Sequence, residues 1–119
     1  MGDAVVLNDP ITGQGANNAA KCARHYLRRI LDRGEKPFDE AWMEETFERF
    51  WDYAGAVVRW TNALLAPPPA HVVELLGAAE AIPSLGEAIV NGFDDPRTYE
   101  PWFFDPAAAA AFIEERRAA

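Results

Sequence analysis

The residues best suited to chemistry lie near the start of the chain, in the segment GDAVVLNDPITGQGANNAAKCA from Gly2 to Ala23. Asp3 follows a glycine, and a carboxylate at such a bend can accept a hydrogen bond from a hydroxyl group, contributing about 1.5 to 3 kcal/mol. The backbone N–H groups of residues 13–17 come at the start of a predicted helix, where unpaired donors and the helix dipole attract an anion. The segment therefore predicts a binding site for a ligand with hydroxyl groups and negative charge.

The order of these features resembles the second FAD fingerprint of flavoprotein monooxygenases, in which a Gly-Asp pair at a strand end precedes a proline-containing loop, a glycine pair and a helix. The stretch NDPITGQGAN is most similar to the oxygenase component of two-component styrene monooxygenases, which are FAD-dependent group E enzymes. The resemblance is strong over this segment and extends to the helical remainder only in layout and length. It implies FAD contacts from Gly2, Asp3, Pro10, Gly13, Gln14, Gly15, Ala16 and Asn17.

This resemblance implies a mechanism in which a separate flavin reductase supplies reduced FAD and oxygen adds to it. The resulting flavin C4a-hydroperoxide then epoxidises a small apolar aromatic alkene such as styrene. Because the cofactor carries the chemistry, no catalytic acid or base is assigned to this chain. Half a positive charge at the helix start, about 4 Å from the anionic flavin edge, would contribute roughly 2 kcal/mol at an effective dielectric of 20.

A complete enzyme of this kind also carries an N-terminal G-x-G-x-x-G unit for the FAD pyrophosphate, which this sequence does not contain. We therefore expect a C-terminal portion that is inactive in isolation and whose partner is a missing N-terminal part or a second copy. Two alternatives stay open. One is a non-catalytic helical interaction fragment with exposed apolar faces; the other is part of another flavoprotein hydroxylase or halogenase.

Hydrophobic periodicity predicts a mainly helical fold that begins with one short strand. The apolar run from Ala4 to Leu7 predicts the strand, and residues 1–17 then form the last piece of the FAD-binding domain of an α/β parent. Residues 18–119 form the helical C-terminal region. Its expected helices cover Asn17 to Arg33, a long helix 39–66 capped by Asp39, Val72 to Ala79, a short helix capped by Ser84, and Pro106 to Arg117, with an aromatic-rich loop from Gly92 to Pro106.

The spacing of apolar residues also predicts which helix faces are buried. In the first helix the expected core face consists of Ala20, Ala23, Leu27, Ile30 and Leu31. In the long helix it consists of Met43, Phe47, Phe50, Ala54, Val57, Thr61 and Leu64. We expect the aromatic residues of this second stripe to pack in the core rather than to line a substrate pocket.

Composition and the remaining reactive residues exclude several other classes. Nineteen acidic and eleven basic residues give a net charge of −8, which disfavours nucleic acid and anionic membranes as partners. The chain shows no signal peptide and no apolar run of membrane-spanning length, so we expect a cytoplasmic protein. Cys22 is expected to be a packed residue, and His25 and His71 are expected at the surface, with no metal site.

Overall fold

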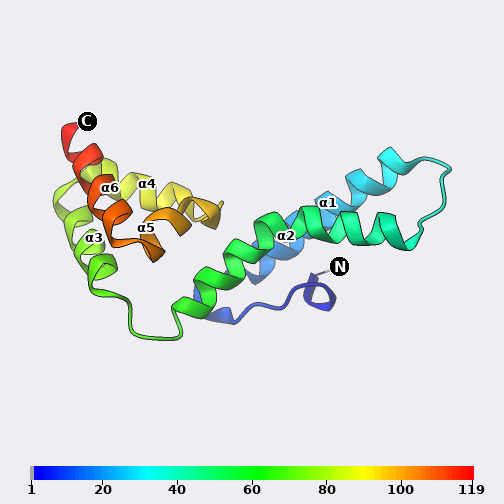
Figure 1. Ribbon diagram of the computed structural model, residues 1–119, viewed down its shortest axis with the longest axis horizontal. Coiled ribbons are helices and arrows are strands. Elements are labelled where there is room, and N and C mark those ends of the chain that lie inside the picture. The colour runs from blue at the N-terminus through cyan, green and yellow to red at the C-terminus, as the bar shows by residue number, and fades with distance from the viewer. Residues whose placement is uncertain (1) are drawn as a thin grey trace. The chain divides into compact units, whose positions relative to one another are not determined.

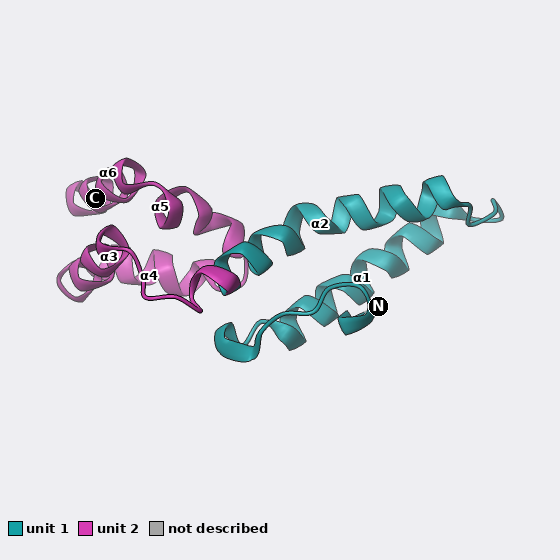
Figure 2. Ribbon diagram, turned by 60° about the horizontal axis from the view of Figure 1, so that its bottom comes forward, with its two compact units in different colours: residues 1–61 teal, residues 62–119 magenta. Residues whose placement is uncertain are grey.

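The computed structural model describes residues 2–119, which form helices joined by turns and loops (Figure 1). Met1, the first residue of the expected 1–17 piece, lies outside the described residues. Within the described range there is no strand, and none of the helices is long and apolar enough to cross a bilayer. The chain divides into two compact units, Met1–Thr61 and Asn62–Ala119, coloured teal and magenta in Figure 2.

The first unit is a hairpin of two antiparallel helices with an N-terminal segment. Its elements are the short 3-10 helices η1 (Gly2–Ala4) and η2 (Pro10–Thr12), then α1 (Gly15–Arg33) and α2 (Glu40–Ala63), whose last two residues extend into the second unit. Gly34 ends α1 with φ 62° and donates its N–H to Leu31 O, and Asp39 Oδ1 accepts from Trp42 N at 2.9 Å at the start of α2. The predicted end of the first helix at Gly34 and the predicted cap of the long helix at Asp39 are confirmed, although α2 ends at Ala63 rather than at residue 66.

The strand predicted for Ala4 to Leu7 is wrong. Ala4 belongs to η1, and the amides of Val5 and Val6 both donate to Gly2 O, at 2.9 and 3.1 Å. A strand needs a neighbouring strand to receive its hydrogen bonds, and residues 2–119 supply none. The apolar run serves packing instead: Val6 is only 8% exposed and belongs to the core cluster with Cys22, Phe50, Tyr53, Ala54 and Val57.

The core face predicted for α1 is also wrong. Ala20 and Ala23 are exposed, and Leu27, Ile30 and Leu31 expose 57%, 42% and 69% of their surface. The face toward α2 is more polar, because His25 Nε2 contacts Thr46 O at 2.8 Å and Arg29 donates to Thr46 Oγ1 at 3.1 Å and Glu45 at 2.8 Å. These hydrogen bonds, with the buried Asn18 and Cys22, replace the expected apolar contact.

On α2 the predicted stripe is buried in its C-terminal part only. Phe50, Ala54, Val57 and Thr61 are buried as expected, together with Trp42 and Trp60. Met43 and Phe47 are 52% and 38% exposed, and Leu64 lies beyond the end of the helix. The loop-proximal halves of both helices therefore leave large apolar side chains uncovered by the chain itself.

The second unit consists of α3 (Ala70–Ala81), α4 (Pro83–Gly92), η3 (Pro96–Thr98), α5 (Glu100–Phe104) and α6 (Pro106–Ala118). The expected loop from Gly92 to Pro106 is thus partly helical. The predicted start of the last helix is confirmed, since Asp105 Oδ1 accepts from Ala107 N at 2.8 Å. The cap predicted at Ser84 is wrong: α4 begins at Pro83, and Ser84 Oγ donates to Arg116 O at 3.0 Å, where it joins α4 to α6.

Candidate functional site

The two parts of the predicted binding segment lie near each other along the first turns of α1. A Cβ built on Gly2 would stand 3.9 Å from Ala19 Cβ, and η1 packs against α1. Ala19 follows Gly15 by one helical turn, a rise of about 6 Å. In Figure 1 the N-terminal segment, drawn in blue, turns back along this helix. Gly2 and the start of α1 therefore lie at the same end of that helix, and contact of Asp3 and the Gly15 amides with one ligand stays a prediction.

The start of α1 follows a left-handed glycine and leaves Gly15 and Ala16 exposed. Gly13 adopts a left-handed conformation, φ 66° and ψ 14°, which turns the chain from η2 into the helix. Gln14 occupies the N-cap position, and its side chain makes no cap hydrogen bond to the helix. The N–H groups of Gly15, Ala16 and Asn17 thus combine an uncapped helix start with the positive end of the helix dipole.

The eight predicted contact residues differ in how much surface they offer. Asp3, Pro10, Gly13, Gly15 and Ala16 are exposed, and Gly2 and Asn17 are partly buried. The side chain of Gln14 is fully buried, and its Oε1 accepts from Asn17 Nδ2 at 3.0 Å. Gln14 therefore braces the loop from inside. Sequence reasoning missed a second brace, the 2.9 Å hydrogen bond between the hydroxyls of Thr12 and Thr61, which holds η2 on α2.

Two asparagines near this segment bury polar atoms that have no hydrogen-bond partner among residues 2–119. They are Nδ2 and Oδ1 of Asn8 and Oδ1 of Asn18. An unsatisfied buried amide costs about 1–3 kcal/mol, and an ordered water is the common partner of such groups. Whether a ligand approaches these enclosed atoms is a separate question from their lack of partners, because all three have almost no solvent-accessible surface. The sequence held one weak signal: asparagine is unusual within a helix, where Asn18 lies.

The second unit contains a separate cavity of about 450 Å³. The rings of Trp102 and Phe112 are nearly parallel in its wall, with centroids 6.3 Å apart, and the guanidinium of Arg116 lies 5.2 Å from the Phe112 centroid. Arg116 Nε is buried without an acceptor among the described residues. Sequence reasoning did not find this cavity, because its residues come from α4, η3, α5 and α6: Ser84, Glu87, Ala88, Asn91, Gly92, Thr98, Trp102, Phe112 and Arg116.

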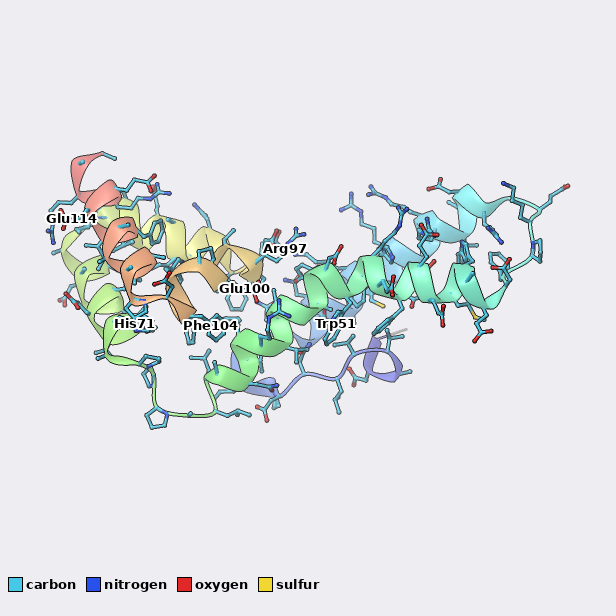
Figure 3. All side chains as sticks on the ribbon, viewed as in Figure 1. Trp51, His71, Arg97, Glu100, Phe104 and Glu114 are labelled. Atoms are coloured by element: carbon cyan, nitrogen blue, oxygen red, sulfur yellow. The ribbon has the colours of Figure 1, made fainter. Side chains whose placement is uncertain are left out.

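The other reactive residues have structural surroundings. Cys22 is 2% exposed within the core of the hairpin, which confirms the prediction that it is packed. The histidines were expected at the surface, but both are partly buried and contact backbone carbonyls: His25 that of Thr46, and His71, labelled in Figure 3, that of Phe103 at 2.9 Å. In residues 2–119 no three His, Cys, Asp or Glu side chains cluster as a metal site would require.

One surface carboxylate has a clearly shifted pKa. Hydrogen bonds from Arg29 and Arg49 to Glu45, at 2.8 and 2.6 Å, hold the pKa of that carboxyl below its usual range. Because Glu45 is exposed, its ion pair with Arg29 acts mainly to orient the Arg29 side chain across the hairpin.

Comparison with known proteins identifies no family. No protein-family model matches the chain, and no curated protein matches its sequence significantly. A functional assignment therefore depends on the residues and the geometry described above.

Proposed function

We propose that the N-terminal segment binds FAD and that the chain is the C-terminal portion of a two-component flavin monooxygenase. The activity proposed is oxygenation of small apolar aromatic alkenes with reduced FAD and O₂. One observation carries this proposal: Gly2 lies against Ala19, so Asp3 and the uncapped amides of Gly15 to Asn17 share one end of α1. A cytoplasmic location, shared with the reductase that would supply the flavin, is part of the proposal.

Each residue has a distinct role in this proposal. The exposed carboxylate of Asp3 accepts a hydrogen bond from a ribityl hydroxyl. The amides at the start of α1 face the negative edge of the reduced ring, where the helix dipole favours the anion. When bound, FAD supplies the oxygen chemistry, and these residues bind and orient it.

A flavin titration of the 119-residue chain tests the proposal. The chain is titrated anaerobically with reduced FAD, and separately with oxidised FAD, by calorimetry. We expect the reduced form to bind more tightly than the oxidised form. We also expect Asp3→Asn to weaken binding several-fold. This loss is smaller than the loss of a buried charge-assisted hydrogen bond, because Asp3 is exposed to solvent. Asp52→Asn is the matched control, since Asp52 is an exposed acid on α2.

The outcomes of this titration separate clearly. No saturable binding of either flavin form up to millimolar concentration would overturn the proposal. Equal affinity of wild type and Asp3→Asn would remove the role given to the carboxylate. An equal loss in Asp3→Asn and Asp52→Asn would show that Asp3 makes no specific contact, because removal of an acidic charge by itself favours binding of the anionic cofactor.

A second candidate function, a non-catalytic helical interaction protein, is favoured by a different observation. The apolar face of α1, which includes Leu27 and Leu31, points to solvent. Soluble proteins rarely leave such a face open unless another molecule covers it.

A further inference from the structure

The hairpin of α1 and α2 has an apolar face that its own chain covers only in part. Val5 and Val6 pack there with Tyr26 of α1 and Val58 of α2. Ile30 follows Tyr26 by one turn, and Phe47 precedes Val58 by three turns, so both lie on the same side of the hairpin, closer to the α1–α2 loop. In that loop-proximal half five large side chains stay exposed. We call this half the open face: Leu27, Ile30, Leu31, Met43 and Phe47.

The open face is continuous across the two helices. The contacts of His25 with Thr46 and of Arg33 with Asp39 set the antiparallel register, and the two helices run side by side in Figures 1 and 2. In this register Leu27 is about level with Phe47, and Ile30 with Met43. Phe47 in turn stacks on Trp51, labelled in Figure 3, with centroids 5.9 Å apart and an interplanar angle of 19°.

Charges of opposite sign border the open face on its two sides. α1 carries five basic residues and one acidic residue, whereas α2 carries five acidic residues and two basic ones. Arg24, one turn before Leu27 and Arg28, lies along the outer edge of α1, and Glu44 and Glu48 follow the outer edge of α2, whereas Arg28 lies nearly opposite Ile30. Arg24, Glu44 and Glu48 are exposed, and none of them makes an ion pair with another part of residues 2–119.

This charge pattern selects one way of pairing two copies. A two-fold axis in the plane of the face can run along the helices or across them. An axis across the helices would lay α1 on α1, with basic residues against basic residues. An axis along the helices lays α1 of each copy on α2 of the other and keeps every residue at its own level. Arg24 then lies level with Glu48 of the second copy.

We infer that the open face is a homodimer interface in which α1 packs on α2 of a second copy. At roughly 200 Å² for a large side chain that is fully exposed, the five residues offer on the order of 500 Å² of apolar surface per copy. Two copies together bury on the order of 1,000 Å², the lower limit for a specific interface. The dimer is therefore weak and depends on protein concentration. This inference is independent of flavin binding.

Charge reversal with rescue tests the inference. The 119-residue chain is studied by sedimentation equilibrium over a wide concentration range, with far-UV circular dichroism to verify that each variant is folded. We expect Arg24→Glu and Glu48→Arg each to weaken the dimer about tenfold, because the two-fold axis repeats every exposed charge pair. The double variant restores the Arg–Glu pairs in reversed orientation and returns the affinity to near wild type. Glu80→Arg, an exposed position on α3, matches the charge change of Glu48→Arg and leaves the dimer unchanged.

Three results would overturn the inference. The chain could stay monomeric at every concentration, so that another partner covers the open face. It could associate equally well in the wild type and in both single variants, which would exclude this pairing of α1 with α2. Lastly, the folded double variant could remain as weak as the single variants, which would show that Arg24 and Glu48 do not meet.

Discussion

Glycine is needed for different reasons at positions 13 and 15. Substitution by alanine at each position shows whether the backbone conformation or the approach of a ligand requires glycine there. Gly13 has a φ of 66°, and no atom lies within 4 Å of the Cβ that Gly13→Ala would add. The cost of this substitution is therefore conformational, about 1–2 kcal/mol for a left-handed L-residue. Gly15 begins α1, has no positive φ and also has open space around its Cβ. Gly15→Ala is expected to be neutral or to stabilise by up to about 1 kcal/mol.

Thermal unfolding followed by far-UV circular dichroism measures this difference. For a unit the size of residues 1–61, a change of 1 kcal/mol shifts Tm by roughly 4–8 °C. Gly13→Ala should therefore lower Tm by at least this amount, while Gly15→Ala leaves it unchanged or raises it. Equal losses in the two variants would refute the reasoning, because only one of the two positions has a left-handed backbone.

The same two variants also test flavin binding, because a loss of FAD affinity without a loss of Tm cannot be caused by unfolding. If the backbone at the start of α1 approaches FAD, a methyl group at position 15 obstructs the cofactor without harming the fold. Gly15→Ala should then weaken binding of reduced FAD while its Tm stays at or above that of wild type. Unchanged affinity in a calorimetric titration would show that this part of the backbone does not touch the cofactor.

Two further predictions concern the second unit. Gly92→Ala places a Cβ 2.6 Å from both Thr98 Oγ1 and Tyr99 Cε1, so it should lower the free energy of unfolding in urea by about 1–3 kcal/mol. Gly77 on α3 has open space around the Cβ position, so Gly77→Ala should raise the free energy of unfolding by up to about 1 kcal/mol. Burial raises the pKa of Tyr99 above its ordinary value of 10.0, so the unfolded chain releases this proton at lower pH than the folded chain. The contribution of Tyr99 to stability is thus present below about pH 10 and lost as pH rises further. Tyr99→Phe should therefore reduce the fall of Tm at alkaline pH. An unchanged dependence of Tm on pH would show that Tyr99 does not cause this fall.

Helix boundaries could be predicted because their causes are local. Gly34 ends α1 through its own φ, and Asp39 and Asp105 accept hydrogen bonds from amides two or three residues away. Such signals act within one turn and do not depend on the rest of the fold. Ser84 was misjudged because its hydroxyl meets Arg116 O, thirty-two positions away, a contact that no local pattern contains.

The buried face of α1 could not be predicted from its apolar periodicity. Periodicity identifies which face is apolar, but it does not identify what the helix packs against. Here Arg29 and His25 find partners at Thr46 of α2, and Val5 and Val6 occupy part of the apolar side. The strand expected at Ala4 to Leu7 failed for a related reason, since a strand exists only where a second strand can pair with it.

The order of a bend at Gly2, a loop and a helix start could be read from the sequence, whereas the contact of these residues with FAD stays a prediction. The nearness of Gly2 to the first turns of α1 follows the expected order of bend, loop and helix. The inward side chain of Gln14 and the unpaired amides of Asn8 and Asn18 depend on how the loop folds onto α1 and α2. These asparagines are therefore the residues that the structure adds to the sequence prediction.

The two proposals are linked through the hairpin. At about 25 cal/mol per Å², leaving on the order of 500 Å² of apolar surface in water forgoes a free energy comparable to the whole stability of a small domain. A second copy on the open face would remove this surface from water, and because the costs of association offset most of the gain, the net stabilisation of unit 1 is small and depends on protein concentration. Val5 and Val6 pack on the same side of the hairpin and connect directly to η1, which carries Asp3. Association would therefore stabilise the scaffold that holds the flavin-binding segment without contributing an atom to the site itself.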